Sequence, residues 1–259
     1  MHAIALSAPD VGALRDRLLA GLDGRGPVAV VERAEAAEAP VQGADSTYRV
    51  DETGRYEARA GAADLDALLD ELAAGHELAL LVGFEELALP RVTVGDDPDA
   101  LVSAPTLEAL DPAEVDEALE SLEPIETLES LVARVKSAPD ADRAGAIATF
   151  TGRVRARDAP DDVPTTELEF EKYEGVADER LAALEAELSA RDGVQEVVLH
   201  HKTGVVEAGE DIVFVVVLAG HRGEAFETVE DGINRLKAEV PLFKKEVTVE
   251  DAFWVHERP

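Results

Sequence analysis

Positive charge is scarce in this chain and gathers in one segment near its end. Six of the 259 residues are lysine, and three of the six, Lys237, Lys244 and Lys245, lie within nine positions of a chain whose formal net charge is −32. Concentrated amines against so acidic a background favour a binding site for an anionic ligand. We therefore take residues 235–246 as the first candidate site.

Other basic side chains of the second half also stand where predicted elements end. Arg153 and Arg155 follow a predicted strand, and His221 with Arg222 joins a strand to a helix. Groups at the loop edges of a rigid scaffold converge readily on one pocket, so we expect these residues and Lys237 to meet there. The alternative for Lys237 alone is a favourable interaction with the dipole at the helix C-terminus, worth about 0.3–1 kcal/mol.

Several kinds of chemistry find no support in the sequence. The chain has no cysteine, which excludes disulfides, thiolate nucleophiles and cysteine-bound metals. His200 and His201 are neighbours on a predicted strand, so we expect their rings to face opposite sides rather than to form a metal site. Ser103 and Ser189 have no plausible base nearby, which gives serine hydrolysis no support. We expect neither a metal nor a cofactor.

The acidity covers both halves of the chain, and lysine is depleted while arginine is not. This pattern favours adaptation to a high-salt cytoplasm, and the alternative is an acidic protein of a mesophile. An acidic surface argues against nucleic-acid binding, whose affinity comes largely from lysine and arginine on phosphates. The longest apolar run, residues 212–219, is too short to cross a bilayer, so we expect a cytoplasmic protein without a membrane partner.

The elements of the first half predict an α/β domain with a parallel sheet. Buried strands without polar alternation, separated by helices, are typical of that fold. The expected strands are 2–7, 27–31, 78–82 and 91–94, and the expected helices begin near Val11 and Asp64. Residues 32–62 show no clear pattern.

The first strand–helix junction is the place to look for a phosphate-binding loop. A Walker A loop needs Gly-x-x-x-x-Gly-Lys-Ser/Thr, but Ala13 and Leu14 stand here in place of the lysine and the hydroxyl. The strand order, residues 45–49 (Asp-Ser-Thr-Tyr-Arg) and residues 82–91, with Gly-Phe-Glu-Glu and Leu-Pro-Arg, resemble the MobB family, a P-loop GTP-binding adaptor of molybdenum-cofactor maturation. The resemblance implies a P-loop-like domain, here without a working loop. A plain structural α/β domain is the alternative.

The two halves are separated by an acid-rich stretch. Residues 111–126 contain many carboxylates and two prolines, Pro112 and Pro124, so we expect a linker. We place the domain boundary near residue 122, which gives domains 1–122 and 123–259.

The second half predicts an α+β domain with a mostly antiparallel sheet. Strands are expected at 145–156, 167–173, 194–201 and 211–219, and a last one carries Val247 and Val249. One helix is expected around residues 181–188, closed by Gly193. A second helix has four apolar residues at helical spacing and is ended by Pro241: Phe226, Val229, Ile233 and Leu236.

Four segments of this half, in order, resemble MoaE, the large catalytic subunit of molybdopterin synthase. They are Gly-Ala-Ile-Ala-Thr-Phe-Thr-Gly-Arg-Val-Arg at 145–155, Ala-Gly-His-Arg at 219–222, Leu-Lys-x-x-x-Pro-x-x-Lys-Lys-Glu at 236–246 and Trp-Val at 254–255. The resemblance covers residues 123–259. It implies conversion of cyclic pyranopterin monophosphate into molybdopterin, with sulfur delivered by the thiocarboxylated C-terminal Gly-Gly of MoaD, a small ubiquitin-like partner. It also implies a homodimer of this chain within a heterotetramer.

The resemblance assigns roles position by position. Lys237 matches the catalytic lysine beside the partner's C-terminus, and Lys244 matches a second required lysine. His221 and Arg222 match the pair that holds the terminal phosphate. The remaining matched positions are expected to contact the substrate or the partner's tail: Arg153, Arg155, Lys245 and Glu246. Arg258 is a weaker candidate, because it lies in a short C-terminal tail.

Two other functions stay open. The chain is alternatively a non-catalytic binding module or scaffold for ubiquitin-like C-terminal tails in cofactor assembly. A nucleotide-dependent adaptor is a third interpretation, which depends on the first half alone.

Overall fold

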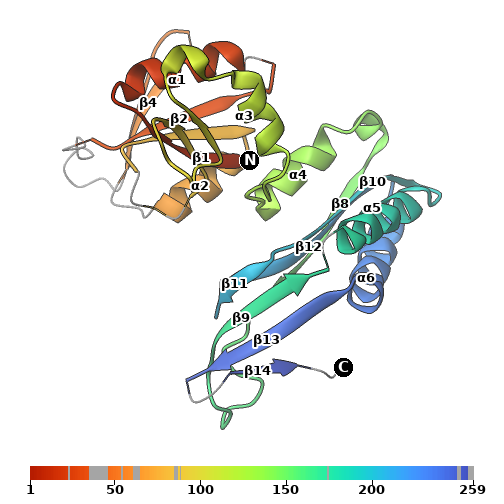
Figure 1. Cartoon of the computed structure of the whole chain (residues 1–259). Helices are drawn as coiled ribbons and strands as arrows, with labels where there is room; N and C mark the ends of the chain where they lie inside the picture. Colours follow the sequence, from red (N-terminus) through yellow and green to blue (C-terminus); the bar gives the residue numbers. More distant parts are fainter. Residues whose placement is uncertain are drawn as a thin grey trace. The chain divides into compact units, whose positions relative to one another are not determined.

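A computed structural model gives the structure of the chain and describes residues 1–22, 24–34, 46–53, 55–60, 65–84, 87, 89–173, 175–249 and 252–255. These residues form two compact units, Met1–Thr127 and Leu128–Pro259 (Figure 1). Arg258, and Asp45, Glu85 and Glu86 of the MobB-like segments, lie outside the described residues.

The first unit contains a parallel sheet, as predicted. Its strands lie in the order β2-β5-β1-β6-β7, and all four pairings are parallel. The elements are β1 (His2–Ser7), α1 (Val11–Gly21), β2 (Val28–Glu32), β3 (Ser46–Val50), β4 (Tyr56–Ala60), α2 (Leu65–Ala73), β5 (Leu78–Val82), β6 (Arg91–Val94), β7 (Val102–Ala104), η1 (Leu107–Ala109) and α3 (Pro112–Leu119). The strands β3 and β4 form a separate antiparallel hairpin within the segment that showed no clear pattern.

Two apolar cores cover the faces of this sheet. One core joins β1 and β5 to α1 and α3, and it buries Leu14 and Leu18 of α1. The other joins the same strands to α2, which buries Leu69 and Ala73. Strands covered on both faces read as continuous apolar runs, which is why the sequence located them well.

The expected acidic linker at residues 111–126 is wrong over much of its length. Residues 112–119 form the helix α3, which buries Val115 and Leu119 in the first core. Asp111 caps this helix by accepting a hydrogen bond from the backbone N–H of Ala113 (3.0 Å), and Pro112 occupies the first helical turn. Asp-Pro is a helix start signal, because the missing N–H of proline costs nothing there.

The junction between β1 and α1 is short and already occupied by a carboxylate. Only residues 8–10 connect the two elements, and Asp10 accepts a hydrogen bond from the N–H of Ala13 (3.0 Å). The N-terminus of a helix attracts anions through its free N–H groups. Here a side chain of the chain itself takes that position.

The strands of the second unit are antiparallel, as predicted, but they form two sheets rather than one. Its elements are α4 (Leu128–Lys136), η2 (Ala141–Arg143), β8 (Ala146–Arg153), β9 (Thr165–Lys172), α5 (Val176–Ser189), β10 (Val194–His201), β11 (Gly204–Glu207), β12 (Asp211–Ala219), α6 (Arg222–Glu239), β13 (Leu242–Thr248) and β14 (Ala252–Val255). A three-stranded sheet has the order β10-β12-β8, and a four-stranded sheet has the order β11-β9-β13-β14.

Helices cover both faces of the three-stranded sheet. On one face α5 packs on β10 while α6 packs on β12 and β8, and the two helices lie side by side (Figure 1). On the other face α4 packs on Phe214 and Val216 of β12. Gly232 lets α6 approach the sheet closely, because a Cβ at that position would lie 3.1 Å from Val215 Cγ1.

Two details of the second unit differ from the sequence prediction. Phe226 is 66% exposed, because the buried face of α6 runs through Ala225 and Val229 instead. The helix α5 ends at Ser189, so Gly193, with a φ of +82°, lies in the turn to β10 rather than at the helix end.

Candidate functional site

Two lysines of the candidate segment come from different elements that meet at Pro241. Lys237 is exposed in the last turn of α6, and Lys244 is half-buried on β13. The helix stops because Pro241 disfavours helical geometry at Val240, whose φ and ψ are −85° and 123°. Within the described part of the chain, neither lysine has an ion pair. Both amines are therefore available to a ligand.

Lys244 faces the interior side of the four-stranded sheet. It lies opposite Phe170 of β9, which is buried with Leu168, Val154 and Val206. Because side chains alternate along a strand, Lys244 shares the face of Phe170, and Lys245 points to the other face. The two neighbouring lysines therefore serve different surfaces.

Lys245 and Glu246 are engaged within the sheet. The Lys245 ammonium lies 2.7 Å from a Glu169 carboxylate oxygen and 6.0 Å from the centre of the Trp254 ring. The hydrogen bond from Lys245 to Glu169 raises the pKa of the lysine. Glu246 accepts a hydrogen bond from the hydroxyl of Thr165. These contacts tie β13 to β9.

Arg153 and Arg155 lie at the end of β8, on either side of a buried valine. The Arg153 Nε lies 3.0 Å from a carboxylate oxygen of Asp211, and the Arg155 guanidinium lies 2.9 Å from Asp158. Val154 packs in the same cluster as Phe170, so the two arginines belong to the end of the unit that carries Lys244. Both are mostly exposed and remain accessible despite their ion pairs.

The register of β8 and β12 places the basic residues at two opposite ends of the unit. Arg153 lies beside Asp211, where β12 begins, whereas Ala146 lies beside Ala219, where β12 ends and His221 follows. The nine residues of β12 span about 27 Å. The helix α6 returns along the sheet, so Lys237 is at the Arg153 end. We call these the lysine end (Lys237, Lys244, Arg153 and Arg155) and the histidine end (His221 and Arg222).

The expectation that these groups meet in one pocket of a single chain is therefore wrong. His221 caps α6 with an extended backbone and no side-chain cap, and both it and Arg222 are exposed. A small ligand bound at the lysine end of one chain is too far away to contact the same chain's His221.

The structure adds His201 to the candidate site residues. His200 stacks on Phe214, whereas the ring of His201 lies edge-on to Phe170 with centroids 4.8 Å apart. The two rings thus face opposite sides, as predicted, and His201 reaches the neighbour of Lys244. Its Nδ1 lies 2.7 Å from the carbonyl oxygen of Lys202, which only accepts, so Nδ1 carries the proton. The two adjacent histidines are visible in the sequence, but the contact of His201 with Phe170 depends on how the strands pair and pack.

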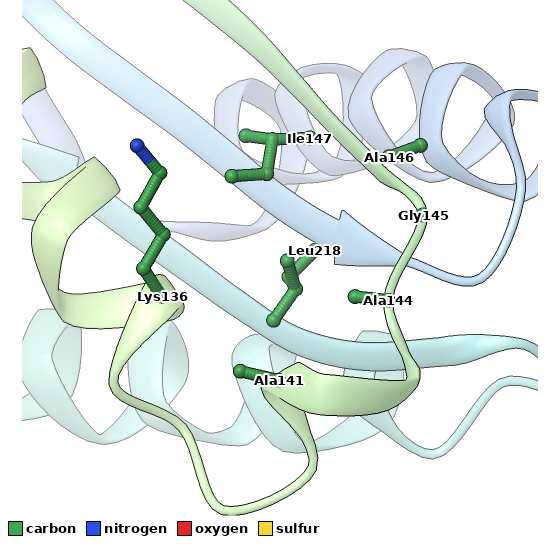
Figure 2. Close-up of a pocket in the computed structure, with 7 residues that line it drawn as sticks. All are labelled: Lys136, Ala141, Ala144, Gly145, Ala146, Ile147 and Leu218. Atoms are coloured by element: carbon green, nitrogen blue, oxygen red, sulfur yellow. The ribbon is translucent and has the colours of Figure 1, made fainter.

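A pocket of about 410 Å³ lies on the α4 side of the three-stranded sheet (Figure 2). Its lining residue Ala146 pairs with Ala219, so the pocket is at the end of β12 that leads to His221. Apolar side chains from η2, β8 and β12 line it, and Lys136 stands at its side. None of the predicted site residues contributes to its lining. Among the described residues, no helix is long and apolar enough to span a membrane, and no three His, Asp or Glu side chains are grouped as metal ligands.

Comparisons with known proteins give consistent matches. The family model "MoaE protein" matches residues 121–239. The chain is 50% identical over 263 aligned positions to "Probable molybdopterin synthase" of Haloferax volcanii, which covers 100% of both chains. It is 38% identical over 117 positions to "Molybdopterin synthase catalytic subunit" of Yersinia pestis, covering 45% of this chain and 76% of that one. A crystal structure of molybdopterin synthase from Staphylococcus aureus is 28% identical, covers 52% of this chain and 94% of that one, and has a TM-score of 0.45.

Proposed function

The chain belongs to the molybdopterin synthase family and is a catalytic subunit of that enzyme of molybdenum-cofactor biosynthesis, and we propose the following roles for its residues in the reaction. The substrate is cyclic pyranopterin monophosphate. Sulfur comes from the thiocarboxylated C-terminus of a MoaD-like, ubiquitin-like partner. The observation that carries this proposal is the 50% identity over the full length to a probable molybdopterin synthase.

The lysine end receives the partner's tail. Lys237 acts directly on the thiocarboxylate as the catalytic amine, and Lys244 is the second required lysine. Neither lysine forms an ion pair with the described residues, which supports this role, because a bound anion then has no carboxylate among those residues to displace. Arg153 and Arg155 supply further positive charge at the same end. For Lys245 and Glu246, substrate contact rests on the family resemblance alone, since both side chains are engaged within the sheet.

The histidine end completes the site of a second copy of the chain. His221 and Arg222 hold the terminal phosphate of the substrate, but about 27 Å of β12 separates them from the lysine end of their own chain. A two-fold dimer brings the lysine end of one copy to the histidine end of the other and forms two identical sites. With one small subunit at each site, the assembly is a heterotetramer.

The test is direct synthesis in multimolar KCl with thiocarboxylated partner and cyclic pyranopterin monophosphate. Lys237→Ala is expected to lose turnover by about 100-fold or more while its thermal unfolding is unchanged. Lys136→Ala is the matched control, because Lys136 is also an exposed lysine of the second unit. Normal dithiolene formation by Lys237→Ala contradicts the assignment. Partner binding without product in the wild-type chain indicates the alternative, a binding module or scaffold.

We also propose that the first unit shares the fold of the MobB family but does not bind a nucleotide. Asp10 at the start of α1 supports the second part, since its carboxylate repels a phosphate. Nucleotide titration of the full chain tests this. Tight magnesium-dependent GTP binding overturns it.

A further inference from the structure

Two arginines and two glutamates close a ring of ion pairs between α5 and α6. Arg180 contacts Glu187 on its own helix (Nη1–Oε1, 3.1 Å) and Glu239 on α6. Arg235 contacts Glu239 on its own helix (Nε–Oε1, 2.8 Å) and Glu187 on α5. Each arginine thus bridges both carboxylates. We call these four residues the α5–α6 ring.

The ring holds the C-terminal end of α6. Arg180 and then Glu187 along α5 pair with Glu239 and then Arg235 back along α6, so the two helices run antiparallel. Glu239 is the last residue of α6. One turn earlier, Arg191 pairs with Asp231 in the same register but outside the ring. The hydrogen bonds of Glu187, first to Arg235 and then to Arg180, lower the pKa of this carboxyl. Glu187 therefore stays charged at neutral and mildly acidic pH.

The last turn of a helix is its weakest part, because its carbonyls lack partners within the helix. In α6 the N–H of Val240 still bonds to the carbonyl of Leu236 (3.1 Å), but Pro241 has no N–H to continue the pattern. Leu236 anchors the turn in the core, where it is 1% exposed. The ring adds a second attachment on the flank that faces α5.

Lys237 stands in the same turn on the opposite flank. At 3.6 residues per turn, Arg235 and Glu239 are about 40° apart around the axis, and Lys237 is about 160° from each of them. The ring therefore does not contact the Lys237 amine. It acts on the backbone that carries Lys237, and Leu236 serves as the pivot between the two flanks.

We propose that the α5–α6 ring is a positioning device, which fixes the last turn of α6 and so sets the direction from which the Lys237 amine enters the site. The inference rests on the proposed function for the role of Lys237. Four pairs arranged as a ring restrain both rotation and fraying of the turn, whereas one exposed pair contributes little. Small displacements of a reacting group are costly, so the ring is expected to affect turnover more than substrate affinity.

The decisive variant is Glu187→Gln, which opens two edges of the ring from α5 and leaves the sequence of α6 intact. We expect kcat to fall about tenfold, while KM for the pterin changes less than about twofold. The matched control is Asp231→Asn, which removes the pair between α6 and Arg191, just after the end of α5, without touching the ring. Its kcat is expected to stay within about twofold of wild type.

A rescue variant separates positioning from general loss of charge. Reversing all four residues (Arg180→Glu, Glu187→Arg, Arg235→Glu and Glu239→Arg) restores every pair, and it places a glutamate four residues before an arginine, the favourable order on a helix. We expect this variant to recover kcat. Recovery of thermal stability without recovery of kcat overturns the proposal, as does a Glu187→Gln kcat no lower than that of Asp231→Asn.

A readout independent of activity uses the scarcity of lysine. After reductive ¹³C-methylation, the six lysines give few enough NMR signals to assign each by Lys→Arg substitution. Glu187→Gln is expected to shift or broaden the Lys237 signal, and Asp231→Asn is not. An unchanged Lys237 signal refutes the ring's role by itself. Full activity of Lys237→Ala refutes the proposed function instead, and the two failures are thus distinguished.

Discussion

A site divided between two copies of the chain predicts rescue when two inactive variants are mixed. The chosen variants are Lys237→Ala, which damages the lysine end, and His221→Ala, which damages the histidine end. Both side chains are exposed, and His221 makes no side-chain cap to α6, so neither change is expected to unfold the chain. In a homodimer of either variant, both shared sites carry one damaged end.

The magnitude of the rescue follows from the geometry. In a mixed dimer one site combines the two damaged ends, and the other combines the two intact ends. Random pairing of equal amounts gives half mixed dimers, so about a quarter of all sites are intact and about a quarter of wild-type activity is expected. The separation of about 27 Å along β12 excludes an intact site built from one chain alone.

The assay measures dithiolene formation after the two variants are co-expressed in equal amounts and purified together through one affinity tag that both carry. Each variant purified alone, and the two mixed without subunit exchange, are the controls. Activity of the co-expressed pair no greater than the mean of the separate variants would falsify the shared site. It would mean that His221 and Lys237 of one chain act together, against the observed register of β8 and β12.

Three further outcomes are expected. Lys244→Met should lower kcat/KM by about 100-fold and leave Tm unchanged. Lys245→Met should lower Tm, because Glu169 loses its partner, and should change kcat/KM only a few-fold. Equal losses of kcat/KM in the two variants would contradict the different roles given to the two lysines. Asp111→Ala should destabilise the first unit by about 1 kcal/mol in urea unfolding without affecting synthesis, because the cap of α3 is lost. Glu185→Gln should raise Tm at about pH 7, because burial raises the folded-state pKa of Glu185 and stability is lost as pH rises through it. The gain in Tm should vanish at a pH well below 4.5, the ordinary pKa of this carboxyl, where Glu185 is protonated in both the folded and the unfolded state. A gain in Tm that does not depend on pH would refute this cause.

Much of the fold could be predicted because its central strands are continuous apolar runs. The strands at 78–82, 91–94, 194–201 and 211–219 have the bounds that the sequence predicts. Short or polar elements were missed, namely the β3–β4 hairpin, β7, β11 and α3. In α3 the many carboxylates concealed a helix whose two buried residues, Val115 and Leu119, are one turn apart.

The sequence marks the candidate site residues, but it does not contain their arrangement. Scarcity marked Lys237 and Lys244, and the order of four motifs marked Arg153, Arg155 and His221. Their separation depends on which strands pair and in which direction, and no local pattern contains that information. The same holds for His201, whose contact with Phe170 joins two different sheets.

Charge statistics treat the four cations of residues 235–246 as equals, but their partners sort them into two kinds. Arg235 and Lys245 are paired with carboxylates of neighbouring elements and hold α6 and β13 in place. Lys237, two residues after Arg235, and Lys244, directly before Lys245, have no ion pair within the described residues. In a chain of net charge −32, carboxylates are plentiful, so an amine left without one on a rigid element is available for an external anion. We propose that the paired cations build the frame and that the unpaired ones are the part of the site that a partner's thiocarboxylate meets.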